Sequence, residues 1–572
     1  MPPQLKYPKD IIREIRYSGS MNSFEDALII GDNQFELLVN VYHDGSKLKK
    51  RPPHKRIHHS DQASGTKTGN WMPVGCGVFR NATATYVCWG TEQGKLWRLK
   101  SDGTNLAEIT LASANSLTAG NRCSIVQYFS NMYSADQVRL LEFDPSSATT
   151  ATNLTSILSA PSNTGITAPY YMAYWQFRLW LGDRAGRIAA CEQEADVSDS
   201  GTDPWQFTGS GYTGFVNPVA SGDGAQISGI AVNNTALVIN KMSAIATEYL
   251  GKTLKVTGTS QADFAVKEIS PVIGYLGSSG QSIGSKMLGL THSGFQYLNT
   301  IEEEGTTTTA GALNTEKIVS GFQKNVIPDF IKDKLKRINI TYAEQVAGIY
   351  DPRNNCYYCS FPYGDVTYNN LTVRIDLTNN DIRMSLFTNT DAQYFFYMNG
   401  FVHFIDRRGN IWKMMDDSLS SYEEEEFTTI ILSKKFPMKD NREFGNVRSF
   451  IPELEIDGTN KTLKLFYNTF TTDTSTRVIN QSTDRKGIVS TTGDYKMIEE
   501  FSFYPNRWDN LIFDLDNYDY QRFATFHPEL STNVNCDYAQ FLLIDQVQDT
   551  DGTKGWNFNG YKVKGSTTGE GL

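Results

Sequence analysis

Residues 72–111 contain one complete repeat of strands and turns. Four strand-like segments lie within it, at residues 74–79, 85–89, 96–99 and 106–111. Glycine-containing turns at Gln93-Gly94 and Asp102-Gly103 separate the later segments. Short strands with such turns are typical of an antiparallel meander. About forty residues for four strands is also the size of one β-propeller blade, a sheet that buries both faces only when neighbouring blades stack on it.

Further strand-like segments follow at similar spacing as far as Met415. They include an apolar hairpin around Asn233-Asn234, a hairpin turning at Ser293-Gly294, and the run 401–413. Residues 173–181 are apolar and aromatic with little alternation, which predicts a single strand at the centre of its sheet. Together these segments predict an all-β chain with a propeller of about six blades over residues 21–415, preceded by an arm at residues 1–20.

One segment inside the predicted propeller has helical periodicity. Ile327, Phe330, Ile331, Leu335 and Ile338 recur at helical spacing, and Pro328 falls in the first turn, where proline is tolerated. The pattern predicts a helix over residues 327–338 that packs on the propeller as a connector between blades.

The character of the sequence changes after Met415. Residues 416–426 are polar and include the carboxylate run 423–426, and the strands beyond them are longer and alternate more regularly. A shift of this kind marks a domain boundary. It predicts an acidic linker at residues 416–426, a separately cored β-sandwich at residues 427–565 and a flexible tail at residues 566–572.

Charge and hydropathy limit the functional classes. The net charge of −10 argues against a protein built to grip nucleic acid. No run approaches the roughly twenty apolar residues of a membrane span, and the first residues lack the apolar core of a signal peptide. We therefore expect no membrane span and synthesis in a cytoplasm. The seven cysteines are scattered, which predicts no disulfide framework.

No motif nominates catalytic or metal-binding residues. The sequence has no nucleophile elbow, phosphate-binding loop or zinc-protease motif. Cys356 and Cys359 form a C-x-x-C, but residues three apart on a strand point to opposite faces, and no second pair of ligands lies near them. We therefore predict no enzyme activity, no cofactor and no metal site.

The densest cationic cluster consists of six residues near the N-terminus: Lys47, Lys49, Lys50, Arg51, Lys55 and Arg56. Three interpretations remain open for it. Lysines on a solvated edge strand prevent edge-to-edge aggregation. The cluster could equally be a docking surface for an acidic protein partner, or a contact with DNA. Of the two functional interpretations, we regard the docking surface as the candidate site.

A series of ordered motifs resembles a known family. The first is Asp32-Asn33-Gln34, Glu36, Asn40-Val41 and a basic stretch that ends in Lys50-Arg51-Pro52. A Gly277-Ser278 loop before the hairpin at 287–298 follows, and then the passage from Gly409-Asn410-Ile411-Trp412 into the acidic spacer. The series is similar to the β-propeller tail nozzle, tail hub or packaged-DNA stabilisation proteins of short-tailed bacteriophages. The family pattern usually has Arg-Pro-Gly where this chain has Arg51-Pro52-Pro53.

The resemblance implies a structural virion protein. Such a protein forms a ring, expected to be a homohexamer, that extends the portal channel, helps retain packaged DNA and lets it pass during ejection without tight binding. Its expected partners are portal or adaptor proteins and tail fibre or other tail proteins, and its location is the virion tail, after synthesis in the bacterial cytoplasm. The alternative is a carbohydrate-binding or glycoside-cleaving propeller, because residues 198–205 nearly match the Asp-box turn of sialidase-type propellers.

Overall fold

The computed structural model describes most of the propeller and the strands that precede and follow it in the chain. The described residues are 10–15, 19–58, 71–111, 115–147, 149–158, 166, 168–184, 186–195, 205, 215–218, 225–233, 236–243, 251–260, 263–300, 303–309, 312–318, 321–323, 327–378, 382–419, 427–437, 445–457, 461–470, 496–503, 521–525, 535–536, 538–547 and 556–567. Within this part of the chain, no helix is long and apolar enough to cross a bilayer.

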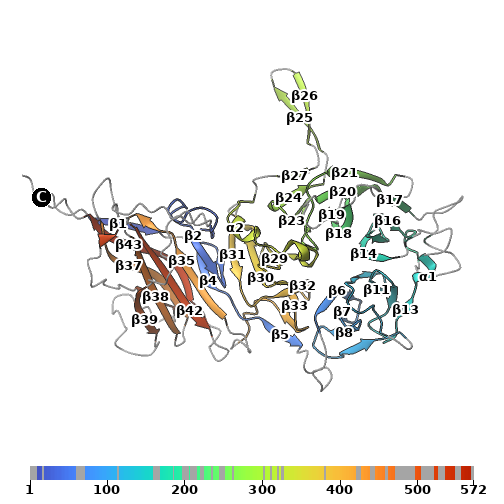
Figure 1. The fold of residues 1–572 in the computed structure, drawn as a ribbon, viewed down its shortest axis with the longest axis horizontal. Coiled ribbons are helices and arrows are strands. Elements are labelled where there is room, and N and C mark those ends of the chain that lie inside the picture. The colour runs from blue at the N-terminus through green and yellow to red at the C-terminus, as the bar shows by residue number, and fades with distance from the viewer. Residues whose placement is uncertain are drawn as a thin grey trace, which may run out of the picture.

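The described strands build a β-propeller, which confirms the predicted fold class (Figure 1). The first blade reproduces the repeat at residues 72–111. The first three blades are β6 (Pro73–Arg80), β7 (Thr85–Thr91), β8 (Leu96–Lys100) and β9 (Ala107–Ile109); β10 (Ser124–Tyr128), β11 (Asn131–Ala135), β12 (Leu140–Phe143) and β13 (Thr152–Asn153), followed by α1 (Thr155–Leu158); and β14 (Pro169–Trp175), β15 (Arg178–Asp183), β16 (Arg187–Ala190) and β17 (Phe215–Pro218).

The next three blades continue the ring. They are β18 (Ala225–Asn233), β19 (Ala236–Ser243), β20 (Gly251–Thr257) and β21 (Ala265–Ser270); β22 (Gln281–Ile283), β23 (Lys286–Thr291), β24 (Gly294–Asn299) and β27 (Gly321–Gln323); and β28 (Ala347–Asp351), β29 (Cys356–Phe361), β30 (Leu371–Asp376) and β31 (Arg383–Phe387). Between β24 and β27 a hairpin of β25 (Glu303–Thr309) and β26 (Ala312–Ile318) projects away from the propeller (Figure 1).

The last blade joins two distant parts of the chain. β32 (Ala392–Met398), β33 (Phe401–Asp406) and β34 (Ile411–Lys413) are completed by β5 (Lys55–His58), which pairs antiparallel with β34. The first strand of each blade contacts that of the next, and β32 contacts β6 to close the ring. The described strands therefore make seven blades, one more than the predicted six.

Apolar clusters fill the spaces between blades. Trp89 and Val87 of the first blade pack with Phe396 and Ile405 of the last, and corresponding clusters lie between the other neighbouring blades. Burial of one large apolar side chain contributes about 1.5–3 kcal/mol. Each blade therefore depends on two neighbours for its stability.

A β-sandwich lies beside the propeller (Figure 1). One sheet has the order β3 (Val41–Asp44), β4 (Lys47–Lys50), β43 (Trp556–Thr567), β37 (Gly445–Asp457) and β40 (Gln521–Thr525), with β1 (Asp10–Ile15) on β43 and β41 (Asn535–Cys536) on β37. The other has the order β2 (Phe35–Val39), β35 (Phe427–Ser433), β42 (Tyr538–Val547), β38 (Lys461–Phe470) and β39 (Lys496–Phe503), with β36 (Phe436–Pro437) on β42.

The N-terminal strands therefore do not belong where the sequence placed them. β1 is paired along its whole length with β43, and β2 to β4 lie in the two sandwich sheets, outside the propeller. Proximity along the chain was misleading, because the apolar side chains of Phe35 and Leu48 are buried against the sandwich residue Phe558 and its neighbours.

The sandwich and the propeller are also not separately cored. One continuous cluster contains Leu290 of the fifth blade, Val373 of the sixth, and Phe436 and Phe541 of the sandwich. In addition, β2 pairs in parallel with β31 at Val39 and Leu386, so the sixth blade and one sandwich sheet form a single sheet. The prediction of two separate cores is wrong.

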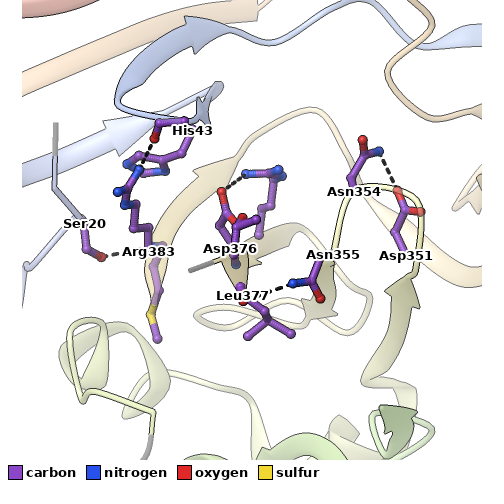
Figure 2. A network of polar contacts seen from close by, with 12 residues as sticks. Ser20, His43, Asp351, Asn354, Asn355, Asp376, Leu377 and Arg383 are labelled. Carbon is purple, nitrogen blue, oxygen red and sulfur yellow. Dashed lines mark hydrogen bonds and ion pairs between the residues drawn. The ribbon is translucent and has the colours of Figure 1, made fainter. Parts of the chain in front are cut away.

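Hydrogen bonds between side chains and backbone groups hold the N-terminal segment in place beside the sixth blade (Figure 2). The backbone N–H of Met384 donates to Ser20 Oγ at 2.9 Å, and His43 Nε2 lies 3.0 Å from the carbonyl of Gly19. Arg383 donates to the carbonyl of Gly45 in the β3–β4 turn. The bond to Ser20 occupies the edge of β31 beside the β2 pairing, where a backbone N–H would otherwise be left unpaired.

The predicted connector helix is much shorter than expected. Only α2 (Lys332–Leu335) is α-helical, followed by the 3-10 turn η2 (Ile340–Gln345). The residue at the N-cap, Ile331, makes no side-chain capping bond, so the helix has no polar start signal. The predicted packing is nevertheless confirmed, because Ile327 and Ile331 are buried in the shared core.

The two-residue turn Gln176-Phe177 divides the segment predicted as a single strand. Both residues have positive φ, +53° and +56°, and the same geometry recurs in the last blade at Asn399-Gly400, with φ of +52° and +81°. Asn-Gly is the preferred sequence for such a turn, whereas a bulky residue there is strained. Phe177 is 50% exposed to solvent, so burial of its ring offsets little of the backbone strain.

Replacing this strained turn should stabilise the protein. We expect the double substitution Gln176→Asn with Phe177→Gly to raise the free energy of unfolding by about 1 kcal/mol, because a left-handed backbone costs a non-glycine residue roughly that amount. The measurement is chemical denaturation. The matched control is the reverse exchange, Asn399→Gln with Gly400→Phe, which should lower stability. A destabilised Gln176→Asn, Phe177→Gly variant would contradict the assignment of strain.

Candidate functional site

The predicted docking cluster does not form one surface. Lys50 and Arg51 are buried. The ammonium of Lys50 lies 3.1 Å from Asp545 Oδ2, and the same oxygen accepts a hydrogen bond from Trp556 Nε1 at 2.9 Å. Lys50 therefore joins β4 to β42 and β43 inside the sandwich, and it is removed from the candidate docking surface.

Arg51 lies where the chain passes from the sandwich to the propeller. Its Cζ is 3.8 Å from the ring centroid of Phe427, a cation–π contact, and its Nε donates to Asn40 Oδ1 at 3.2 Å. Asn40 in turn donates to Thr388 Oγ1 at 2.7 Å. Arg51 thus holds the sandwich strand β35 close to the sixth blade, which is a structural role.

The other four cations are dispersed. Lys49 pairs with Asp44 across the β3–β4 hairpin, and Lys47 is only partly exposed. Lys55 is exposed on β5, and Arg56 beside it lies 5.7 Å from the ring centroid of Trp412. The alternation of side chains along β4 sends neighbouring residues to opposite faces, which is why a dense run in sequence is not dense in space.

Two further motif residues near the N-terminus make polar contacts within the sandwich. Asp32 pairs with the largely buried ammonium of Lys434 at 2.7 Å. Glu36 accepts a hydrogen bond from Gln540 Nε2 at 2.6 Å. The segment that carries the family resemblance therefore fixes N-terminal residues to the C-terminal strands of the sandwich, and only its residues Asn40 and Arg51 contact the sixth blade.

A second polar site lies at one end of the propeller axis. Five residues form it, and we refer to them as the axial mouth: Arg122, Tyr170, Arg184, Glu344 and Tyr394. They come from the segment before β10, from β14, from the β15–β16 turn, from η2 and from β32. Because strands β10, β14 and β32 are innermost in their blades, residues at their starts meet around the axis.

Arginine and tyrosine side chains are linked in pairs across the axial mouth. Arg122 Nη2 donates to the Tyr394 hydroxyl at 2.6 Å, and Arg184 Nη2 lies 2.6 Å from Glu344 Oε2. The Arg184 guanidinium also lies 5.0 Å from the ring centroid of Tyr170. Burial raises the pKa of Tyr394 and of Tyr170, so both phenols are neutral at physiological pH.

A cavity of ≈ 520 Å³ also lies in the propeller, and none of the five residues of the axial mouth lines it. Met172 and Gly277 are among its lining residues, and the backbone of Gly277 lies against the backbone of Glu344. Tyr350 and Tyr397 supply aromatic walls. Its volume is in the range of small-molecule sites, and it mixes apolar walls with hydroxyl and amide groups.

No sequence motif marks the axial mouth as a whole, although one repeated turn indicates part of it. Four blades share a turn with threonine or aspartate followed three residues later by a glycine of positive φ: Thr91/Gly94, Asp183/Gly186, Thr291/Gly294 and Asp406/Gly409. Arg184 directly follows the aspartate of one such turn. Aligning the repeats would have placed Arg184 at the end of the blade that faces the axial mouth.

Cys356, Cys359 and two buried histidines make contacts inside the protein. Cys356 and Cys359 are buried on opposite faces of the sixth blade, in different apolar clusters, as predicted for a strand. Buried His54 lies 3.0 Å from Thr390 Oγ1 and accepts the backbone N–H of Met415 at 3.1 Å. Burial lowers the pKa of His403 to about 4. Among the described residues, no group of three or more potential ligands is placed to hold a metal ion.

Removing Lys50 should be costly. We expect Lys50→Ala to lower the free energy of unfolding by about 3–5 kcal/mol, because it leaves the buried Asp545 carboxylate without its counter-charge. Lys47→Ala is the matched control on the same strand and should change stability by no more than about 0.5 kcal/mol. Equal stabilities of the two variants in denaturant titrations would contradict the buried ion pair of Lys50.

A carboxyl group in the last blade should make stability depend on pH. Burial and the nearby Asp406 carboxylate raise the pKa of Asp391 to about 7, against the opposing effect of Arg407, whose Nε lies 3.4 Å away. The folded state therefore holds a proton that the unfolded state releases near pH 4, and this contribution to stability is lost as pH rises from 4 through 7.

Asp391→Asn removes the titrating group. We expect the variant to match the wild-type protein near pH 4 and to exceed its unfolding free energy at pH 8 by on the order of 1–2 kcal/mol, after allowance for solvent screening. Denaturation at a series of pH values measures the difference. A difference that does not grow with pH would contradict the raised pKa.

Comparisons with known proteins identify no family for this chain. No family and no curated protein matches the chain. Among solved structures, the chain is similar to BamB from Moraxella catarrhalis, with 11% identity over 72% of this chain and 99% of that one and a TM-score of 0.35. It is also similar to the WD40 repeats of RRP9, with 8% identity over 64% and 99% of the two chains and a TM-score of 0.38. These similarities concern the fold alone.

Proposed function

We propose that this protein is a structural component of the tail of a short-tailed bacteriophage, a nozzle or hub subunit that forms a ring extending the portal channel. The observation that carries the proposal is that the family-like motif makes structural contacts within the sandwich and, through Asn40 and Arg51, at its joint with the propeller. Asp32, Glu36, Asn40, Lys50 and Arg51 each contact a residue far away in the chain. A motif with this role suits a building block better than a reactive site.

Rigidity supports the same proposal. The sixth blade and the sandwich share a sheet and a core, so the two domains cannot rotate freely about a linker. A ring closes only if every subunit presents its two contact surfaces at a fixed angle. A subunit with a fixed angle between its domains meets that requirement without help from a partner.

Charge is compatible with passage of DNA. At a net charge of −10 the protein offers few cations to phosphates, and each neutralised phosphate would add salt-dependent affinity that slows a moving duplex. The proposed partners are further copies of this chain, portal or adaptor proteins and other tail proteins. Lys55 and Arg56, on the outer strand of the last blade, remain the part of the predicted cluster suited to docking a partner.

The test is assembly on the portal complex. We expect the purified full-length protein to join isolated portal–adaptor particles as a ring visible by electron microscopy, and to bind duplex DNA weakly at physiological salt. Lys55→Glu with Arg56→Glu should weaken attachment, and more so at low salt, where charges are least screened. Lys267→Glu, an exposed lysine on β21 of the fourth blade, is the matched control.

Two outcomes would reject the proposal. One is absence of the protein from purified virions. The other is tight, salt-sensitive DNA binding that the Lys55→Glu, Arg56→Glu variant abolishes while assembly stays normal, because the exposed cations would then serve DNA and not a protein neighbour.

A further inference from the structure

The projecting hairpin of β25 and β26 is a sheet of its own. Its strands are seven residues each, and they pair with each other from Glu303↔Ile318 to Thr309↔Ala312 and with no other described strand. At about 3.4 Å per residue, such a strand extends for about 24 Å, and Figure 1 shows the hairpin pointing away from the propeller. A two-stranded hairpin by itself is marginally stable in water. A further strand at its edge would supply the missing pairing.

Charged residues are confined to the base of this hairpin. Glu303, Glu304, Glu316 and Lys317 lie in the three residue pairs nearest the propeller, and their three carboxylates and one ammonium sum to a net charge of −2. The outer pairs have no charged residue, no proline and no register shift. These are the features with which proteins protect exposed strand edges. The outer part of the hairpin is therefore suited to pair with another strand.

The last blade offers a strand edge of the opposite charge. β5 is the outermost strand of its sheet, paired on one side with β34 and with no described strand on the other. On it, Lys55 is exposed and Arg56 is partly exposed. Addition of a strand to such an edge is a common mode of recognition, in which main-chain hydrogen bonds provide affinity. Complementary charge, acidic on the hairpin and basic on β5, then selects the partner.

The hairpin and β5 lie on different sides of one subunit. The hairpin leaves the fifth blade, whereas β5 belongs to the seventh. Figure 1 shows the hairpin at the upper edge of the propeller and β5 at the lower edge. A contact between two different surfaces of identical chains is heterologous, so it repeats from copy to copy and gives a ring when the rotation closes.

We propose that the β25–β26 hairpin of one subunit adds to the outer edge of β5 in a second copy of this chain, with Glu303, Glu304 and Glu316 beside Lys55 and Arg56. The inference rests on the proposed function and deepens it, because it names the contact between neighbouring subunits of the ring. The cations of β5 thereby receive a partner of defined chemistry, an acidic and otherwise uncharged strand pair.

Complementation between two defective variants tests the contact. One variant has residues 303–318 replaced by a short glycine-serine linker, and the other is Lys55→Glu with Arg56→Glu. Each alone should self-associate at least tenfold more weakly than the wild-type protein, because it lacks one of the two surfaces. Mixed, they should form one-to-one pairs, since one supplies β5 and the other the hairpin. Sedimentation of differently tagged full-length chains, with and without portal–adaptor particles, measures the association.

Charge reversal on both sides gives a second measurement that keeps the hairpin intact. Glu303→Lys with Glu304→Lys should also weaken association at least tenfold. Combining this pair with Lys55→Glu and Arg56→Glu should restore most of the affinity, because the attraction is re-established with opposite signs. Lys267→Glu, on the outermost strand β21 of the fourth blade, is the matched control and should leave association unchanged.

Three results would overturn the contact. The first is a mixture of the two defective variants that associates no better than either alone, and the second is a combined charge reversal that restores nothing. The third is normal ring formation on portal–adaptor particles by the hairpin-deleted protein, which would leave the proposed function standing. Loss of portal attachment with unchanged association between copies would also reject this contact, because the hairpin would then serve the portal complex.

Discussion

A four-stranded blade has two apolar faces, and both are shielded from water in every blade only when the ring of blades is closed. In this protein the closing contact is a strand pair between β5 and β34, contributed by residues more than 350 positions apart in the 572-residue chain. Closure brings Trp89 and Phe396 into one cluster between the first and last blades. An open ring would leave one face of the first blade and one face of the last blade exposed to water.

Distant parts of the chain also pair in the sandwich, where N-terminal strands complete sheets made from the C-terminal part of the chain. The alignment of these strands is set by polar groups inside an apolar core. Burying Lys50 and Asp545 removes both charges from water, which is tolerated only where the two groups meet. A shifted strand register would leave each charge buried without its partner. Apolar packing thus stabilises the joint, and buried charge fixes how its strands align.

Sequence patterns predicted the propeller, the first blade and the hairpins at Asn233 and Ser293 because these have ordinary turn chemistry and short apolar strands. They failed at Gln176-Phe177, because these residues are not typical of the left-handed turn that they form. The hairpin of β14 and β15 was therefore predicted as a single strand. The placement of residues 35–50 in the propeller was wrong because a local pattern does not specify a distant partner strand, such as the pairing of Leu48 with Phe558. The axial mouth was invisible for the same reason, since its arginines and tyrosines meet only through the circular arrangement of blades.

The interleaving of the two ends of the chain has a consequence for biosynthesis. Strands β1 to β5 leave the ribosome first, yet their partners β34, β35 and β43 are among the last to be translated. The nascent chain must therefore wait, with its first strands unpaired, until nearly all of the polypeptide has emerged, and such long-range pairing makes folding slow. A truncated chain that lacks β43 leaves β1, β4 and β37 without their partner strand, so the sandwich cannot form even where the propeller closes.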